Sequence, residues 1–377
     1  MPETNSPLYI GLMSGTSLDG VDGVLSAFSA QSSAHPIQTL ASAYLSFSAT
    51  LREELMALQA PGDNEIHREA MAANALAQVY ADCVTRMLAE CGIEPERVCA
   101  IGAHGQTVRH RPELGYTWQT NNPALLAELT GIDVIADFRS RDIAAGGQGA
   151  PLVPAFHQAV FGDASESRVV ANIGGIGNIS ILKNGQEVTG FDTGPGNLLM
   201  DAWIARHQGK AYDADGAWAA SGRVLPDLLA ALQDEPFFAL PPPKSTGRDL
   251  FHPAWLAQKL APFPGSSPVD VQATLAAFTA ATLADAIVSH ALDAKAAYVC
   301  GGGAYNAHLM HQLQQALASR KHAAVVQSTA ALGVSPNHVE ALAFAWLARQ
   351  HVERRTGNLP SVTGARGLRV LGACYPA

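Results

Sequence analysis

Residues 169–197 read VVANIGGIGNISILKNGQEVTGFDTGPGN, and this stretch decides the fold. Apolar, β-branched runs alternate in it with short turns rich in glycine, which is the pattern of consecutive strands. The dipeptide Asn184-Gly185 suits a tight hairpin, because both central residues of such a turn need a positive φ. The pattern therefore predicts three antiparallel strands that end at Asp192. They cover residues 168–173, 178–183 and 188–191.

Two glycine-rich turns lie at the ends of this hairpin. Glycine lets backbone N–H groups approach an anion without a Cβ in the way. Two such turns separated by one hairpin indicate a single polyphosphate site, with the carboxylate of Asp192 as a catalytic candidate at a strand end. Glycines in hairpins often serve only to form turns, and this alternative stays open for each turn taken alone. The candidate phosphate-binding residues are Gly174, Gly175, Asn178, Gly194 and Gly196.

The N-terminus repeats the same order of strand, turn, strand and strand. Apolar runs at 8–13 and 21–28 flank the turn SGTSLDG, and a third strand is expected between residues 39 and 47. Asp19 and Asp22 could hold Mg²⁺ through water, since magnesium keeps several of its own waters. A hydroxyl-rich hairpin without a ligand is the alternative. The candidate residues of this turn are Ser14, Gly15, Thr16, Ser17, Leu18, Asp19, Gly20, Val21 and Asp22.

Composition excludes several classes of protein. The 377 residues suffice for two domains, and 33 acidic against 24 basic residues give a net charge of -9, which repels nucleic acid and acidic membrane surfaces. Five cysteines without CxxC spacing indicate neither a disulfide framework nor a zinc site. The N-terminus lacks the features of a signal peptide, and the apolar stretch 271–292 carries polar residues typical of a buried helix. We therefore expect a cytoplasmic protein.

Polar residues follow two further strands of the N-terminal half. The strand at 98–103 ends at His104, and the strand at 132–136 is followed by Arg139. Polar side chains at such strand ends lie where open α/β sheets bind ligands. A hydrogen-bonded structural histidine and surface salt bridges are the alternatives. The positive patch expected from the arginines comprises Arg109, Arg111, Arg139 and Arg141.

The C-terminal half returns to alternating helix and strand. A strand at 297–300 is followed by three glycines, and a helix starts at Asn306. Such a loop lets a ribose or a flat ring lie against backbone, although close packing of helix on strand is the alternative. Glu340 lies near the start of a later helix, where it could complement the helix dipole or bind a sugar hydroxyl. The three glycines are Gly301, Gly302 and Gly303.

Two irregular segments remain. Residues 212–221 are acidic and aromatic, and residues 240–251, LPPPKSTGRDLF, are rich in proline. Each could be a lid over a ligand or only an insertion.

The sequence resembles the superfamily of sugar kinases, Hsp70 and actin. Each of its two halves opens with a phosphate-type hairpin, and a glycine-rich loop follows near the end of the second half. Within this superfamily, the order of several motifs resembles the anhydro-N-acetylmuramic acid kinase family. The resemblance covers nearly the whole chain, and residues 212–251 are the part that matches least. The motifs are SGTSLDGVD (14–22), AHGQTVRH (103–110), NIGGIGNIS (172–180), FDTGPGN (191–197), CGGGAYN (300–306) and GNLPSVTGA (357–365).

The resemblance implies an α/β fold of two actin-like, ribonuclease H-like domains, each a mixed sheet flanked by helices, around a nucleotide cleft. We expect domain I to cover residues 1–138 with 356–377, and domain II to cover residues 139–355. The resemblance further implies a kinase of cell-wall (peptidoglycan) recycling that uses ATP, Mg²⁺ and water. It would open the 1,6-anhydro ring of anhydro-N-acetylmuramic acid and phosphorylate O6, giving N-acetylmuramic acid 6-phosphate and ADP.

The resemblance also implies roles for the candidate residues. Asp192 would be the base that activates the water attacking C1. The turns at 15–22 and 174–178 would position the phosphates, with Asp19 on the magnesium side. The residues expected to contact the sugar are His104, Arg139, Glu340 and Ser14, and those expected to receive adenosine are Gly301, Gly302, Gly303 and Asn306.

Three other functions compete with the kinase. A nucleotide-driven conformational switch of the same fold would share the hairpins and the triple glycine, but would not need Asp192, Glu340 and an arginine patch. A dinucleotide-dependent oxidoreductase is disfavoured because no GxGxxG stands between strand and helix. A plain glycosidase would have no use for three phosphate or nucleotide loops. The expected partners are the anhydro amino sugar and ATP, with no nucleic acid and no membrane, and a homodimer is an expectation from the family.

Overall fold

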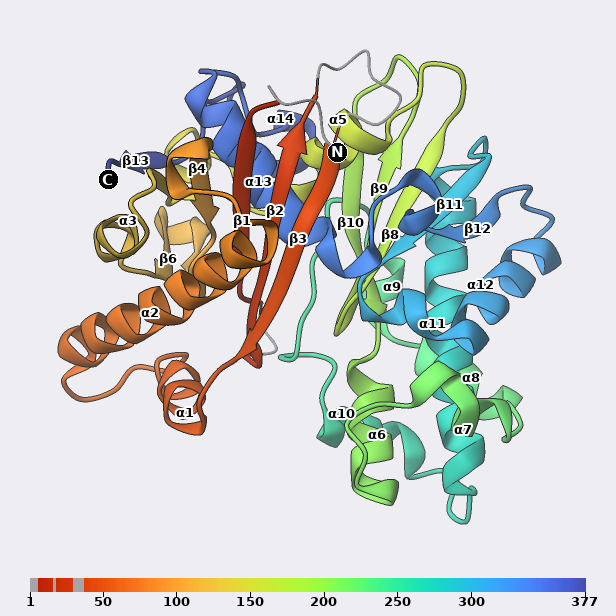
Figure 1. The fold of residues 1–377 in the computed structure, drawn as a ribbon. Coiled ribbons are helices and arrows are strands. Elements are labelled where there is room, and N and C mark those ends of the chain that lie inside the picture. Colours follow the sequence, from red (N-terminus) through yellow and green to blue (C-terminus); the bar gives the residue numbers. More distant parts are fainter. Residues whose placement is uncertain (1–5, 16–17, 30–36) are drawn as a thin grey trace. The chain divides into compact units, whose positions relative to one another are not determined.

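The computed structural model describes residues 6–15, 18–29 and 37–377. The chain divides into two compact units (Figure 1): unit 1 is Met1–Val160 with His338–Ala377, and unit 2 is Phe161–Asn337. These crossings differ from the boundaries at residues 138 and 355 that the sequence indicated. One reason is the buried carboxylate of Asp142, whose Oδ1 accepts hydrogen bonds from Asn358 Nδ2 (2.7 Å) and Thr363 Oγ1 (2.8 Å) and so ties its segment to the C-terminus.

Unit 1 is built on a six-stranded sheet with the order β13-β7-β4-β1-β2-β3. The first three strands of the chain pair antiparallel, and β4 pairs parallel with both β1 and β7. The strands are β1 (Leu8–Met13), β2 (Gly20–Phe28), β3 (Ile37–Ser46), β4 (Val98–Ala103), β7 (Val134–Ala136) and β13 (Ala373–Tyr375). A separate hairpin is made of β5 (Gln106–Arg111) and β6 (Tyr116–Thr120).

Helices cover both faces of this sheet. Successive residues of a strand point to opposite faces. A Cβ on Gly11 of β1 would meet α13, whereas a Cβ on Gly23 of β2 would meet Cys83 and Met87 of α2. The helices of unit 1 are α1 (Ala49–Ala57), α2 (Glu65–Cys91), α3 (Pro123–Thr130), α4 (Ser140–Ala144), α5 (Val153–Phe161), α13 (Val339–Val352) and α14 (Pro360–Thr363).

Unit 2 has a five-stranded sheet with the order β10-β9-β8-β11-β12. β8, β9 and β10 pair antiparallel, and β11 pairs parallel with both β8 and β12. This is the order of β3-β2-β1-β4-β7 in unit 1, so the predicted repeat of one mixed-sheet domain is confirmed. The strands are β8 (Arg168–Ile173), β9 (Ile176–Leu182), β10 (Thr189–Pro195), β11 (Ala296–Cys300) and β12 (Val325–Ser328).

The core helix of unit 2 is α11, as the apolar stretch predicted. It is long and apolar enough to cross a membrane by length and composition, but 78% of its most apolar window is buried inside the structure. A helix that is apolar all round and buried by its own unit is typical of a protein core. The helices of unit 2 are α6 (Leu198–Gln208), α7 (Ala217–Ala220), α8 (Pro226–Gln233), α9 (Pro236–Ala239), α10 (Pro253–Leu260), α11 (Pro268–His290) and α12 (Ala307–Ser319).

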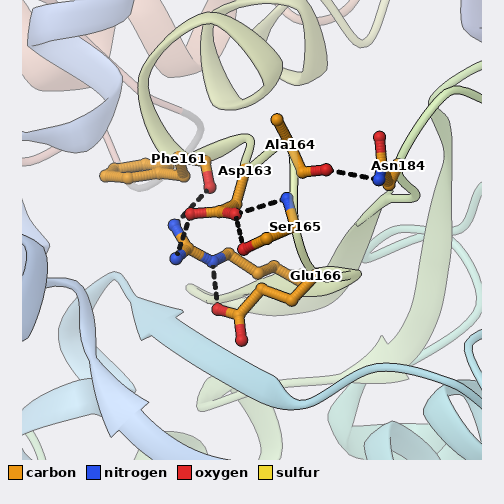
Figure 2. A network of polar contacts seen from close by, with 7 residues as sticks. Phe161, Asp163, Ala164, Ser165, Glu166 and Asn184 are labelled. Carbon is orange, nitrogen blue, oxygen red and sulfur yellow. Dashed lines mark hydrogen bonds and ion pairs between the residues drawn. The ribbon is translucent and has the colours of Figure 1, made fainter.

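A polar network fixes the entry into β8 (Figure 2). Arg168 donates to Asp163 Oδ2 at 2.8 Å, to Glu166 Oε1 at 2.7 Å and to the carbonyl of Phe161 at 3.1 Å. The amide of Asn184, at the predicted hairpin turn, donates to the carbonyl of Ala164. The network therefore connects both ends of the β8–β9 hairpin to the segment that enters it.

Candidate active site

The centre of unit 2 is a row of polar residues across three strands. Asn172 of β8 lies opposite Asn178 of β9, and Asn178 lies opposite Asp192 of β10. Directly paired residues share a face of the sheet. The predicted base and one of the predicted phosphate-turn residues are thus neighbours on one face.

Asp192 is held by a segment far away in the sequence. Its backbone N–H donates to the carbonyl of Lys244 at 3.1 Å, and the N–H of Thr246 donates to Asp192 Oδ2 at 2.9 Å. Burial raises the pKa of Asp192 to about 6, and the bond from Thr246 opposes part of that rise. A carboxyl group with this pKa is ionised at neutral pH and basic enough to take a proton from water.

The two glycine turns of the hairpin are hydrogen-bonded to each other. The N–H groups of Gly196 and Asn197 donate to the carbonyls of Gly175 and Gly174, at 2.9 and 2.8 Å. A Cβ on Gly174 or Gly175 would make no contact closer than ordinary van der Waals distance, whereas a Cβ on Gly196 would lie 2.3 Å from the carbonyl oxygen of Gly174. Gly174 and Gly175 therefore leave room for a ligand, and Gly196 is required by packing.

Packing within unit 2 also explains Gly194. Its φ is +129°, a value that favours glycine, and a Cβ there would lie 2.8 Å from the ring of Phe238.

A cavity of about 500 Å³ lies beside the triple glycine. Gly302 lines it, and a Cβ there would approach nothing closer than Asn197 Nδ2 at 3.6 Å. By contrast, a Cβ on Gly303 would lie 2.3 Å from Ile173 Cγ2, and Gly301 has a φ of +78°. Gly302 is thus the glycine that leaves backbone open to a ligand. The cavity has the size of a small-molecule site and fits a nucleoside.

Polar side chains complete the lining of this cavity. They include Asn197, Asp201, Asp213, Tyr305 and Asn306. Asn306 is also the N-cap of α12, since its Oδ1 accepts from the N–H of Leu309 at 2.9 Å. Burial, and then the nearby charge of Asp213, raise the pKa of Asp201 to about 7. The sequence indicated Asn306 but did not single out Asp213, which belongs to the irregular segment at 212–221.

In unit 1 the predicted sugar contacts lie at the ends of β1 and β4. Ser14, which follows β1, is buried; its Oγ donates to the carbonyl of Gly105 at 3.1 Å and lies 3.1 Å from the hydroxyl of Tyr80. Because the Ser14 proton is used by Gly105, Tyr80 is the donor of the second bond. Tyr80 was not predicted. Its signal was a tyrosine on the buried stripe of a helix, whose hydroxyl must find a partner in the core.

His104 and Arg139 form one rigid pair. The Nε and Nη2 atoms of Arg139 donate to His104 Nε2 at 3.1 and 2.8 Å, and Arg139 Nη1 donates to the carbonyl of Gly149 at 2.8 Å. Because Arg139 can only donate, Nε2 is the unprotonated nitrogen and Nδ1–H faces the carbonyl of Ser14 at 3.4 Å. Burial and then the charge of Arg139 lower the pKa of His104 to about 3, and burial lowers that of Arg139 to about 10. The histidine is thus neutral and the arginine charged at neutral pH.

Acidic groups interact with this pair. Desolvation raises the pKa of Glu340, and the charge of Arg139 opposes that rise. Partial desolvation, followed by the charges of Asp19 and Glu340, raises the pKa of Asp22 to about 6. Two carboxylates close enough to affect each other are the kind of donor set by which Mg²⁺, with its waters, is bound. The described residues hold no group of three or more His, Cys, Asp or Glu side chains suited to a metal ion.

The remaining predicted residues of the N-terminal turn have different positions. Thr16 and Ser17 lie outside the described residues. The N–H of Leu18 donates to the carbonyl of Gly15 at 3.2 Å. Gly20 and Val21 are buried in β2, where a Cβ on Gly20 would lie 2.4 Å from the carbonyl oxygen of Leu45.

Two arginines of the expected patch are engaged elsewhere. Arg109 forms an ion pair with Glu65 at 2.5 Å, and Arg111 pairs with Glu113. The alternative of surface salt bridges is therefore confirmed for these two residues, and Arg139 is the arginine that contacts His104.

The class of protein follows from three features: the duplicated sheet order, the open glycine turns and the nucleoside-sized cavity. They define a two-unit α/β protein with a candidate nucleotide site. The family model for anhydro-N-acetylmuramic acid kinase matches residues 7–377. The chain belongs to the anhydro-N-acetylmuramic acid kinase family, as its motifs predicted.

Curated relatives agree with this membership. The chain is 60% identical to the anhydro-N-acetylmuramic acid kinase of Burkholderia orbicola (strain MC0-3) over 370 residues, which cover 98% of this chain and 96% of that protein. It is 60% identical over 375 residues to the protein of that name from Cupriavidus pinatubonensis (strain JMP 134), covering 98% of each. Among solved structures, component A of the Acidaminococcus fermentans (R)-2-hydroxyglutaryl-CoA dehydratase is similar at a TM-score of 0.49 and 10% identity, over 90% of this chain and 96% of that one.

Proposed function

We propose that the chain is an ATP-dependent kinase that opens the 1,6-anhydro ring of anhydro-N-acetylmuramic acid and phosphorylates O6. The products are N-acetylmuramic acid 6-phosphate and ADP, in the recycling of cell-wall peptidoglycan. Membership of the family supports the activity, and the state of Asp192 supports its mechanism. This residue is partly buried, and its backbone N–H and its carboxylate each form one hydrogen bond with the 244–246 segment. Burial raises the pKa of the carboxyl group to about 6.

Asp192 is the general base. Thr246 occupies Oδ2, which leaves Oδ1 to take a proton from water. The water oxygen forms a bond to C1 as the bond between C1 and O6 breaks. O6 takes the γ-phosphoryl group of ATP, and ADP leaves. Because the phosphoryl group captures O6, no carboxylic acid has to protonate it, and one carboxylate suffices where a glycosidase usually needs two.

The residues of unit 1 bind the sugar. Arg139 is a half-buried cation whose orientation is set by His104 and Gly149, and Glu340 is the acid whose charge it balances. The fixed guanidinium of Arg139 can bind the carboxylate of an amino sugar acid. The carboxylate of Glu340 can accept a hydrogen bond from a hydroxyl of that sugar. Ser14 adds a hydroxyl whose direction is set by Tyr80 and Gly105.

ATP binds through backbone left open by glycine. Gly302 and the cavity beside it receive adenosine, and the turn at Gly174 and Gly175 receives the phosphates. Asp19 and Asp22 are the residues that would hold Mg²⁺, and the ion would supply positive charge to the phosphate oxygens. The cytoplasmic location and a homodimer stay predictions.

The test measures ADP release with Mg-ATP, with and without anhydro-N-acetylmuramic acid, in H₂¹⁸O. The wild type should release ADP only with the sugar and should place ¹⁸O at C1. Asp192→Asn should reduce both signals by about 100-fold or more, the usual contribution of a general base. The matched control is Asp227→Asn, an exposed carboxylate on α8.

Two outcomes would contradict the proposal in different ways. ADP release that ignores the sugar would favour a nucleotide-driven switch and refute the kinase. Full activity of Asp192→Asn would be consistent with the kinase activity but would refute the role of Asp192 as the base.

A further inference from the structure

Asp192 lies on an edge strand. β10 is the outermost strand of the unit 2 sheet, so its outer backbone groups have no strand to pair with. Residues 244–246 occupy this edge at Asp192, because Lys244 accepts from the Asp192 N–H and Thr246 donates to its carboxylate. The position of this segment therefore sets both the backbone and the side chain of the proposed base.

The segment itself lies outside helix and strand. Residues 240–246 read LPPPKST, and three successive prolines have no N–H groups with which to form a ladder. The side chain of Lys244, which is partly buried, connects this segment to α9. The Nζ atom donates to the carbonyls of Phe237 at 3.2 Å and Phe238 at 3.1 Å.

Lys244 thus connects α9, through its side chain, with Asp192, through its backbone carbonyl. Its ammonium lies 4.7 Å from the centre of the Phe237 ring, a distance at which a cation is attracted by the ring face. The carbonyls that it contacts belong to the short helix α9. Its own carbonyl, in contrast, accepts from Asp192.

We propose that Lys244 is a positioning residue for the base: its side chain anchors the segment on α9, and the anchored segment holds the carboxylate of Asp192 in the orientation that leaves Oδ1 for water. This inference rests on the proposed function, because it assigns Lys244 to the same step. Lys244 itself touches no reacting atom. Its effect passes through its carbonyl and through the N–H of Thr246.

The pH dependence of the reaction reports this connection. The Thr246 N–H stabilises the ionised form of Asp192, so its loss raises the pKa of that carboxyl further. Among the described residues, Lys244 and His290 of α11 both contact the ring of Phe191, the neighbour of Asp192 that points to the other face of β10. Two further charged groups lie near them: Lys183, whose charge lowers the pKa of His290, and Asp285 of α11, which lines the same cavity as Lys244 and His290. The facing residue on β9 is Asn178, which does not titrate.

The experiment compares Lys244→Met, which keeps the length of the side chain, with Lys244→Arg, which keeps the donors. Lys210→Met, at an exposed position, is the matched control. For Lys244→Met we expect kcat to fall by about 10-fold to 100-fold, the range expected when a reacting group is misplaced by about 1 Å. KM for ATP should stay within about twofold, and the acidic limb of the kcat profile should move to higher pH by roughly half a unit or more. Lys244→Arg should restore most of the activity.

Two results would overturn the inference. One is a Lys244→Met enzyme with the kcat and the acidic limb of Lys210→Met. The other is a loss of kcat that Lys244→Arg does not restore and that leaves the acidic limb in place, since that combination indicates general damage to the fold. If the wild type itself releases ADP without regard to the sugar, the proposed function fails instead. In that case, ¹³C NMR of the carboxyl groups, which follows the titration of Asp192 in the wild type and in Lys244→Met, still tests whether Lys244 positions Asp192.

Discussion

Replacing Gly11 by alanine should displace helix α13 and, with it, a proposed sugar contact. A Cβ on Gly11 would lie 1.8 Å from the carbonyl oxygen of Ala341 and 2.7 Å from the backbone N of Ala345, whereas ordinary contacts begin near 3.4 Å. Both atoms belong to the backbone of α13, so no side chain can rotate away. The helix would have to move by about 1.6 Å, and Glu340 directly precedes Ala341.

The magnitude follows from overpacking. Inserting a methyl group into a closed core costs about 1–3 kcal/mol, and more when backbone must move. For a unit of this size, about 3 kcal/mol lowers Tm by about 6–12 °C. Thermal unfolding and the KM for the sugar should therefore change together in Gly11→Ala, with KM rising. Gly62→Ala is the control, because its Cβ would meet only the flexible end of Arg68. A Gly11→Ala protein with the Tm and KM of the wild type would refute the reasoning.

Three other predictions concern unit 2. Because the pKa of Asp192 in the folded protein is about 6, kcat should fall by about tenfold per pH unit below that value. This pKa lies above 3.8, the ordinary value of an aspartate, so Asp192→Asn should raise Tm at pH 8 more than at pH 4. An equal change of Tm at both pH values would contradict the raised pKa. The variants Gly302→Ala and Gly303→Ala should separate the effect on ligand binding from the effect on packing. Gly302→Ala should raise KM for ATP and leave Tm unchanged. Gly303→Ala should lower Tm, because its Cβ would lie 2.3 Å from Ile173. Similar Tm values for the two variants would refute this assignment.

Local patterns predicted the fold well because they recur within a few residues. The β8–β9–β10 hairpins follow from alternating apolar residues and from the turn at Asn184. The same reasoning found the first three strands, and the repeat of the two patterns indicated the duplicated sheet. It did not locate the crossings between the units. That information lies in contacts such as Asp142 with Asn358 and Thr363, which are more than two hundred residues apart in the chain.

The sequence singled out candidate residues whose side chains carry recognisable chemistry at strand ends, and it missed Tyr80, Asp213 and the backbone of Thr246. Asp192, His104 and Arg139 were singled out because polar residues follow strands. Thr246 supplies a backbone N–H over a separation of 54 residues, and no residue type is needed for that, so the sequence carries no mark of it. Glycines were also ambiguous in the sequence. The structure distinguishes Gly302 from Gly303, because a Cβ would have room at Gly302 but not at Gly303.

The surroundings of Asp192 bear on why its unit suits a kinase rather than a glycosidase. An acid catalyst for the leaving oxygen needs a carboxyl group that is protonated at neutral pH, beside a second one that is not. The residues that face Asp192 across the strands of unit 2 are Asn178 and Asn172, and its hydrogen-bond donor is the backbone of Thr246. None of these groups can give a proton to an alkoxide. With a pKa of about 6, Asp192 itself is ionised at neutral pH and can only accept one. In the reaction proposed above, the oxygen released from C1 is instead captured by an electrophile, the γ-phosphoryl group of ATP.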